Sequence, residues 1–149
     1  MSSNDAKLDA LIKRVELFNG LTRDEVAKIF SKGMTMHCVK DEVLFHKGNT
    51  GNQMYVVLGG KIGIYDGKKI IAVLRTGDMF GEMSLVTAEP RSATAKAMEN
   101  SKLFVLSQTT FERLLTKRVS IRILMNIIKT LSHRIKETNA QIKSDDRMY

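Results

Sequence analysis

The part of the sequence from Met34 to about Leu106 is divided into short apolar segments rich in β-branched residues. Segments of this length, bounded by turn residues, are typical of β-strands. The Asp66-Gly67 pair is well suited to a tight hairpin, because glycine accepts a positive φ there. Many short strands with frequent turns predict an antiparallel β-roll that resembles a jelly roll. The predicted strands include residues 43–45, 54–58, 62–65, 70–74, 92–97 and 103–106.

Helices are predicted on both sides of this roll. Before it, apolar residues recur at helical spacing from Leu8 to Val15, and Thr22 with Glu25 has the pattern of a capping box. After Thr109, helical periodicity continues to about Lys143 without glycine or proline, which predicts a long uninterrupted helical region. The expected fold class is α+β, mainly β, in one domain of 149 residues. Its expected parts are N-terminal helices (1–33), the roll (34–108) and C-terminal helices (109–149).

The long terminal helix carries an apolar seam whose members alternate spacings of three and four residues. Such heptad spacing is typical of two helices packed together, so we interpret the seam as a homodimer interface. The alternative is a helix packed on its own roll, which Ile123 and Ile127 also allow. The seam consists of Ile121, Leu124, Ile128, Leu131, Ile135, Thr138 and Ile142.

The composition argues against several classes of protein. No stretch approaches the ~20 consecutive apolar residues of a membrane-spanning helix, and residues 1–7 lack the apolar core of a secretory signal. Together with the single cysteine, Cys38, this predicts a cytoplasmic protein with no membrane partner. The net charge of +8 is spread along the chain without interleaved aromatic residues, which favours a solvated surface and anionic small molecules over nucleic acid.

The candidate binding chemistry lies between residues 77 and 94. Gly81 leads from a predicted strand into a short helical turn, whose first N–H groups have no acceptor within the turn and attract a phosphate. Arg91, fixed behind Pro90, adds a planar guanidinium that can donate two hydrogen bonds to phosphate oxygens. Glu82 would repel the phosphate but can accept hydrogen bonds from a ribose hydroxyl. Together these residues predict a bound nucleotide with its sugar near Glu82.

The same residues resemble a known family. Phe80-Gly81-Glu82 followed by Pro90-Arg91-Ser92-Ala93-Thr94 is similar to the phosphate-binding cassette, here residues 80–94, of the cyclic-nucleotide-binding domain family. This family includes the catabolite activator proteins (Crp-Fnr-like regulators), the regulatory subunits of cyclic-AMP-dependent kinase and cyclic-nucleotide-gated channels. The resemblance extends through residues 17–21, Gly48, residues 54–57, Gly60 and the terminal helix.

The resemblance implies roles for the residues of the cassette. Glu82 would bind the ribose 2′-hydroxyl, and Arg91 would pair with the cyclic phosphate. After Gly81, Met83 and Ser84 would offer backbone N–H groups. Ser92 would offer its hydroxyl or its amide.

The resemblance also implies contacts outside the cassette. Ile64 and Ile71 would line the apolar wall, although both are at least as well suited to be ordinary core residues. Thr138 would meet an adenine, and Asn139 would reach the base bound by the partner subunit. This favours cyclic AMP over cyclic GMP as the ligand, but Ser92 can also bond to a guanine amino group, so the base stays open.

An enzyme is the first alternative, because jelly-roll proteins can hold metals on clustered histidines. His37, His46 and His133 show no metal-ligand spacing, and no known nucleotide-hydrolysing or nucleophile motif is present. We therefore expect no catalytic residue, no metal and no cofactor beyond the ligand.

A transcription factor is the second alternative. No helix-turn-helix pattern follows the long helix, so direct DNA binding by this chain is not expected unless it is a fragment of a longer regulator. The resemblance indicates bacterial signalling, by a free-standing sensor or by the input domain of a protein with a fused or separate effector. A dimerisation module that has lost the nucleotide would have a damaged cassette, whereas this cassette is intact.

Overall fold

The structure is a computed structural model that describes residues 3–146. Helices α1 (Ser3–Arg14) and α2 (Arg23–Lys32) precede the strands, and the long helix α3 (Lys117–Asp146) follows them. Short helical turns η1 (Glu16–Phe18), η2 (Glu82–Leu85) and η3 (Thr110–Leu114) lie between these elements. The strands are β1 (Met34–Cys38), β2 (Val43–Phe45), β3 (Gln53–Gly59), β4 (Ile62–Asp66), β5 (Lys69–Leu74), β6 (Met79–Phe80), β7 (Thr94–Ala97) and β8 (Ser101–Ser107).

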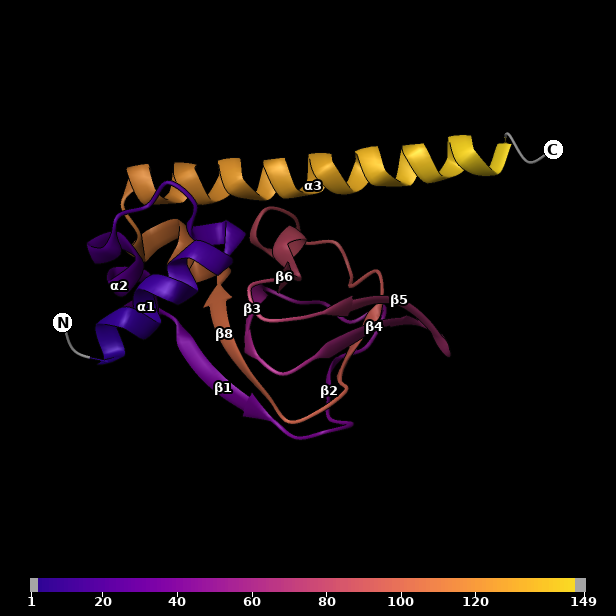
Figure 1. Ribbon diagram of the computed structural model, residues 1–149, viewed down its shortest axis with the longest axis horizontal. Coiled ribbons are helices and arrows are strands. Elements are labelled where there is room, and N and C mark those ends of the chain that lie inside the picture. Colours follow the sequence, from indigo (N-terminus) through magenta and orange to yellow (C-terminus); the bar gives the residue numbers. More distant parts are fainter. Residues whose placement is uncertain (1–2, 147–149) are drawn as a thin grey trace.

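The strands form two antiparallel sheets that pack face to face (Figure 1). One sheet has the order β1-β8-β3-β6 and the other has the order β2-β7-β4-β5. The predicted hairpin joins β4 to β5, and Gly67 in its turn has a φ of +61°. The predicted fold class, a mainly β roll flanked by N-terminal helices and a long C-terminal helix, is confirmed.

The β1-β8-β3-β6 sheet is the middle layer of the molecule. On one of its faces, Met54, Val56 and Phe104 pack against the helices, while on the other face Tyr55 and Val57 pack against the second sheet. Since both faces are buried, β3 is a continuous apolar run instead of an alternating one. This layering explains why residues 54–58 lack the period of two expected for a strand with one solvated face.

Helix α2 begins at the predicted capping box. The Thr22 hydroxyl accepts a hydrogen bond from the Glu25 N–H (3.2 Å), and the Glu25 carboxylate accepts one from the Thr22 N–H (3.0 Å). The same carboxylate pairs with Arg118 at the start of α3 (3.1 Å), so the cap also ties the two helices together. The side chains of Leu8 and Leu11, which predicted α1, lie outside the described residues.

The prediction of an uninterrupted helical region after Thr109 is wrong at Leu115. The chain makes one wide helical turn, η3, and then Leu115 adopts an extended conformation (φ −94°, ψ 150°). The reason is local, because the Thr116 hydroxyl accepts a hydrogen bond from the Val119 N–H (3.3 Å) and caps a new helix. Helix α3 therefore starts at Lys117 with its own direction.

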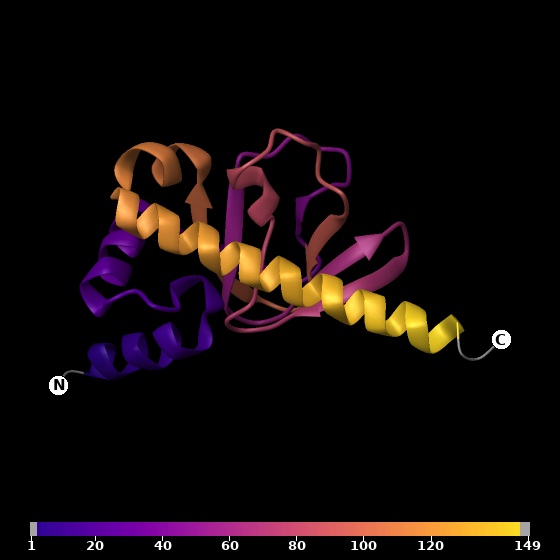
Figure 2. The same ribbon diagram turned by 90° about the horizontal axis from the view of Figure 1, so that it is seen from above.

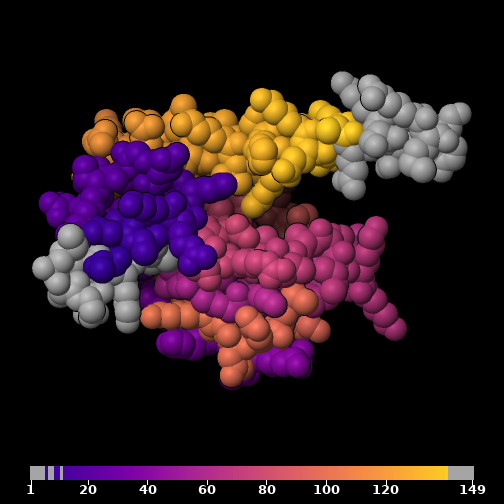
Figure 3. All heavy atoms as spheres, in the orientation of Figure 1, coloured from indigo at the N-terminus to yellow at the C-terminus, as the bar shows by residue number. Residues whose placement is uncertain are grey.

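Helix α3 has two apolar faces, and it lies across the N-terminal helices and the roll (Figures 2 and 3). Ile123 and Ile127 are buried against the roll, at 0% and 2% exposure, whereas Ile121, Ile128 and Ile135 of the predicted seam are each about 60% exposed. The helix thus packs on its own domain, with Leu124 and Leu131 of the seam partly buried against the core, and presents the three isoleucines of the seam outward. Ile142, the last residue of the seam, lies outside the residues whose side chains are described. In residues 3–146, no helix combines the length and the apolar character needed to cross a bilayer.

We predict that the fully buried residues of α3, and not the exposed isoleucines of its seam, hold the helix on the domain. Ile123→Ala should lower the free energy of unfolding by about 2–5 kcal/mol, because it leaves a cavity in the core. Urea denaturation measures this, with Ile71→Ala, at a position that is half exposed, as the matched control costing less than about 1 kcal/mol. An equal loss of unfolding free energy in the two variants would contradict the packing of Ile123 in the core.

Candidate functional site

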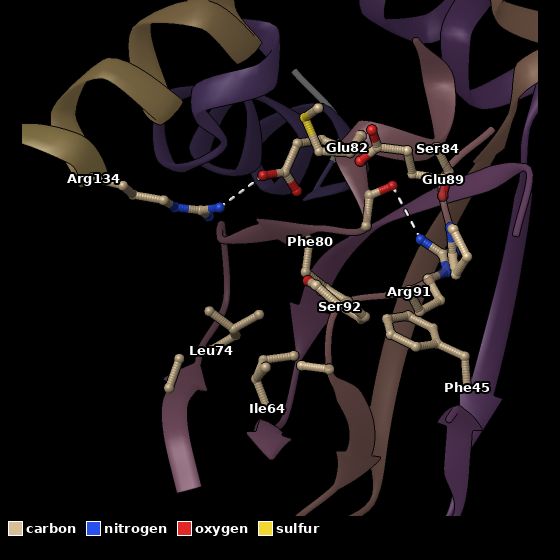
Figure 4. Close-up of a pocket in the computed structure, with 15 residues that line it drawn as sticks. Phe45, Ile64, Leu74, Phe80, Glu82, Ser84, Glu89, Arg91, Ser92 and Arg134 are labelled. Carbon is tan, nitrogen blue, oxygen red and sulfur yellow. Dashed lines mark hydrogen bonds and ion pairs between the residues drawn. The ribbon is translucent and has the colours of Figure 1, made fainter. Parts of the chain in front are cut away.

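A cavity of about 450 Å³ lies between the β2-β7-β4-β5 sheet, the η2 turn and helix α3 (Figure 4). Its volume is in the range of small-molecule sites. Its floor is apolar and its rim carries charged and polar groups from the predicted cassette. It is lined by Phe45, Ile64, Ala72, Leu74, Phe80, Gly81, Glu82, Met83, Ser84, Glu89, Pro90, Arg91, Ser92, Ala93 and Arg134.

The glycine-led turn has the predicted geometry. Gly81 adopts the left-handed conformation (φ 72°, ψ 15°) and begins η2, whose residues Glu82, Ser84 and Leu85 are buried. The Ser84 N–H donates to the Gly81 carbonyl oxygen (3.2 Å), so this amide is engaged within the turn. Met83 lies at the cavity rim and is 44% exposed.

Arg91 is buried beside this turn, with 8% of its surface exposed. Its Nη1 donates to the Gly81 carbonyl (3.2 Å) and its Nη2 donates to the Gln53 carbonyl (2.7 Å). The backbone of Arg91 is held as well, because its N–H donates to the Asn49 carbonyl and its carbonyl accepts from the Gly48 N–H (both 2.8 Å). The structure therefore brings together the arginine and the glycine-led turn that the sequence placed ten residues apart.

The Arg91 guanidinium lacks an anionic partner. No ion pair joins it to a carboxylate among the residues that the structure describes, and its Nε there is a buried donor without a hydrogen-bond acceptor. Its Cζ lies 4.1 Å from the centre of the Phe45 ring, a cation–π contact. Burial lowers the pKa of the Arg91 guanidinium, and electrostatic interactions with Tyr55 and Glu82 act in the opposite direction. A buried cation with an unused donor is suited to receive an anion.

Glu82 lies on the other side of the turn and is also buried. Its Oε1 accepts a hydrogen bond from Nη1 of Arg134 on α3 (2.7 Å; Figure 4). Arg134 Nη2 also donates to the Met79 carbonyl (3.1 Å). Sequence reasoning missed Arg134. The available signal was its place one helical turn before Thr138, because residues four apart share a helix face.

The apolar wall differs from the prediction at one residue. Ile64 lines the cavity as expected, but Ile71 is 52% exposed and does not. The register shifts at this point, because Ile64 pairs with Ala72 while Tyr65 pairs with Ile70, so Ile71 is the extra residue of a β-bulge. Past the bulge, Ala72 and Leu74 face inward and complete the wall.

Of the residues predicted to contact the base, one lines the cavity and two do not. Ser92 is exposed and lines the cavity. Thr138 and Asn139 are exposed on α3 and line a second cavity, of about 310 Å³, that shares only Arg134 with the first. The Thr138 hydroxyl donates to the Arg134 carbonyl (2.9 Å). A single chain therefore does not bring Thr138 and Asn139 into the cassette.

The described residues contain no cluster of three or more histidine, cysteine, aspartate or glutamate side chains that could hold a metal ion. Cys38 is buried, and its thiol donates to the Ser101 carbonyl (3.7 Å). Burial, reinforced by the negative charge of Glu42, raises the pKa of the Cys38 thiol. The thiol thus has the surroundings of a structural cysteine and not of a nucleophile.

Comparison with known proteins agrees with this geometry. The family model described as cyclic nucleotide-binding domain matches residues 35–118, more than half of the chain. The chain therefore belongs to the cyclic nucleotide-binding domain family. This confirms the resemblance found in the sequence.

Individual relatives are similar over much of this chain. The cyclic AMP receptor protein of Thermus thermophilus is 28% identical over 136 residues, which are 88% of this chain and 62% of that protein. The cAMP-dependent protein kinase regulatory subunit of Hypocrea atroviridis is 29% identical over 104 residues, which are 70% of this chain and 22% of that protein. The chain thus spans less than two thirds of the length of these relatives.

Solved structures share the fold. The crystal structure of the Thermus thermophilus catabolite activator protein matches with a TM-score of 0.76 and 28% identity, covering 86% of this chain and 62% of that one. A cyclic nucleotide-binding domain from Methylobacillus flagellatus matches with a TM-score of 0.78 and 24% identity, covering 92% of this chain and 81% of that one.

We predict that Gly81 is needed both for its backbone conformation and for the room it leaves. Gly81→Ala should lower the free energy of unfolding because alanine is strained at this φ and its Cβ would lie 2.6 Å from Arg91 Nη1. Gly67→Ala is the matched control, since Gly67 has a similar positive φ and nothing within 4 Å of the added Cβ.

In urea denaturation, Gly67→Ala should cost about 1–2 kcal/mol through the backbone alone. Gly81→Ala should cost at least about 1 kcal/mol more, because the guanidinium must move. An equal cost for the two variants would show that Arg91 is not held against this glycine.

Proposed function

We propose that this cyclic nucleotide-binding domain is a sensor that prefers cyclic AMP to cyclic GMP and reports the ligand through α3. The observation that carries the proposal is the buried guanidinium of Arg91, a cavity-lining residue that has no anionic partner among the described residues. A singly charged phosphodiester supplies the missing negative charge. The ligand phosphate therefore lies between Arg91 and the η2 turn.

In this proposal Glu82 recognises the sugar. The Glu82 carboxylate is 6% exposed, and burial strengthens the hydrogen bonds it accepts. A ribose 2′-hydroxyl donates to it, as the phosphate contacts Arg91 and the amides of Gly81 and Met83. Ile64 packs against the ligand from the β4 wall, and Ser92 donates from the rim. The Ser84 amide reaches the ligand only if it leaves the Gly81 carbonyl.

The contact between Glu82 and Arg134 makes α3 sensitive to the ligand. A ribose hydroxyl on Glu82 competes with Arg134 for the same carboxylate, which Arg134 holds at 2.7 Å in this structure. Because Arg134 belongs to α3, weakening the Glu82–Arg134 contact makes the present position of α3 less stable relative to other positions of the helix. A ligand shifts an equilibrium only by its differential affinity for the two arrangements, and this contact supplies such a difference.

Two observations support the preference for cyclic AMP: two residues on α3 and the similarity of this chain to cyclic-AMP-related proteins. One relative is a cyclic AMP receptor protein and another is a regulatory subunit of cAMP-dependent kinase. Thr138 and Asn139 lie one helical turn beyond Arg134, where movement of α3 or a second subunit brings them to the base. The Thr138 hydroxyl is the contact to adenine, and Asn139 is the contact to the base in the partner subunit.

The exposed seam of α3 forms the homodimer in this proposal. Three isoleucines at intervals of seven residues, Ile121, Ile128 and Ile135, are each about 60% exposed on one face of the helix. An apolar row of this length on a free helix face is stabilised by a second copy of the helix. The chain is then one cytoplasmic domain with three parts. These are the N-terminal helices (1–33), the ligand-binding roll (34–108) and the dimerising helical region (109–149).

In this proposal, the activity that the sensor regulates belongs to another domain or to another protein. The longer relatives include a cyclic AMP receptor protein and a kinase regulatory subunit, so the sensor is a regulatory module without catalysis of its own. In a bacterial signalling protein it would act on a fused or separate effector. We assign no DNA contact and no membrane contact to this chain.

We predict that Arg91→Ala weakens cyclic nucleotide binding by about 2–4 kcal/mol, because the phosphate loses its buried charge partner. Isothermal titration calorimetry with cyclic AMP and cyclic GMP measures this and also ranks the two bases. Arg75→Ala removes an exposed arginine outside the cavity and should leave the affinity unchanged. If Arg91→Ala bound as tightly as the parent protein, the cassette would not be the phosphate site.

We predict that the seam holds two copies together. Ile128→Asp places a charge in the centre of the seam and should convert the dimer to a monomer in sedimentation velocity experiments at micromolar concentration. Ile70→Asp makes the same change at an isoleucine of similar exposure on β5 and should leave the dimer intact. A dimer that survives Ile128→Asp would assign the interface to another surface.

A further inference from the structure

We infer that Phe45 and Gly51 are positioning residues that hold the Arg91 guanidinium in its phosphate-binding orientation before the ligand arrives. The inference rests on the proposed function of Arg91 and adds two residues outside the cassette. Phe45 ends β2, and Gly51 lies in the loop between β2 and β3. Neither residue belongs to the glycine-led turn or to its neighbours in sequence.

Gly51 leaves room for the guanidinium. A Cβ added at Gly51 would lie 2.5 Å from Arg91 Nε and Nη2 and 2.6 Å from Cζ, so a methyl group and the guanidinium cannot occupy their present places together. Gly51 does not have a positive φ, unlike Gly48 or Gly81, so its backbone accepts alanine. Glycine is therefore needed at this position because it lacks a side chain, and not because of its backbone conformation.

Phe45 provides the surface on which the guanidinium lies. Arg91 Cζ is 4.1 Å from the centre of the Phe45 ring, and the ring is itself held by Tyr55 and Phe80 at centroid distances of 5.9 and 6.1 Å. Tyr55 and Phe80 are stacked on each other at 4.9 Å. A cation–π contact strengthens when water is excluded, and Arg91 is 8% exposed.

These contacts hold the guanidinium on several sides. The Gly81 and Gln53 carbonyls hold Nη1 and Nη2, the Phe45 ring covers the plane, and the Gly51 backbone limits the side nearest Nε and Nη2. An arginine that is free in solution loses rotamer freedom when it binds an anion, whereas a fixed arginine has lost it during folding. Phe45 and Gly51 thus raise the affinity for the nucleotide without contacting its phosphate themselves.

The first test compares two glycine-to-alanine variants of the whole chain. Gly51→Ala should weaken cyclic AMP binding by about 10- to 100-fold in calorimetric titration, because the added methyl group displaces the guanidinium. Gly59→Ala is the matched control, since its Cβ would meet nothing within 4 Å, and it should bind like the parent protein. An affinity for Gly51→Ala within about twofold of the parent would overturn the inference.

The second test separates the aromatic surface from the packing of Phe45. Phe45→Leu keeps an apolar side chain and should lose about 3- to 30-fold in affinity, whereas Phe45→Tyr keeps the ring and should restore most of it. In an Arg91→Ala background, Gly51→Ala and Phe45→Leu should each change the affinity by less than about twofold, because the group that they position is absent. Additive losses in that background would mean that both residues act only on the fold.

A third measurement needs no ligand. The Arg91 Nε–H is buried and lies next to the Phe45 ring, so its proton resonance should be shifted by the ring and protected from exchange with water. Phe45→Leu and Gly51→Ala should each move this resonance, and Gly59→Ala should not. If the parent protein binds neither cyclic nucleotide, the proposed function fails. If it binds, but neither the Arg91 resonance nor the affinity changes in Gly51→Ala and Phe45→Leu, then the positioning role is wrong while the proposed function stands.

Discussion

The site depends on a buried cation that forms no ion pair with a carboxylate among the described residues. Arg91 has 8% of its surface exposed, and its acceptors are the carbonyls of Gly81 and Gln53. Carbonyl groups and an aromatic ring reduce the cost of burying the charge but do not cancel it, so the guanidinium retains a strong preference for an anion. The roll provides the necessary surroundings, because β2, β3 and the η2 turn converge on this one side chain. The same convergence is the basis for the inference that Arg91 is held in place before a ligand arrives.

Helix α3 joins this site to the outside of the molecule. Its inner face packs on the core through Ile123 and Ile127, and Arg134 reaches from it to the buried carboxylate of Glu82. Its outer face exposes Ile121, Ile128 and Ile135, where a second copy is proposed to bind. In the proposed function, a helix that contacts both Glu82, the proposed sugar-binding residue, and a partner subunit would transmit a change from one to the other, since it is a single rigid element. The Thr116 cap gives α3 a start of its own, separate from η3.

Local patterns predicted much of the fold and of the site. The capping box at Thr22 and the hairpin at Gly67 each depend on residues close in sequence, and the structure confirms both. The errors have a different origin. Ile71 was assigned to the cavity wall by resemblance to the family, but a β-bulge leaves its side chain exposed. The helix after Thr109 was predicted to be unbroken because the segment contains no glycine or proline, but the Thr116 hydroxyl caps a new helix.

The sequence by itself determined which chemical groups are present and which short segments hold them: a glycine-led turn, an arginine behind a proline, a carboxylate between them, and a helix with two apolar faces. The tertiary structure alone decided that Phe45 lies under Arg91, that Gly51 leaves room beside it, and that Arg134 reaches Glu82 from 52 residues away. The physical reason is that turns and caps follow from hydrogen bonds within a few residues. Contacts between distant segments follow from how sheets and helices pack, which no local pattern encodes.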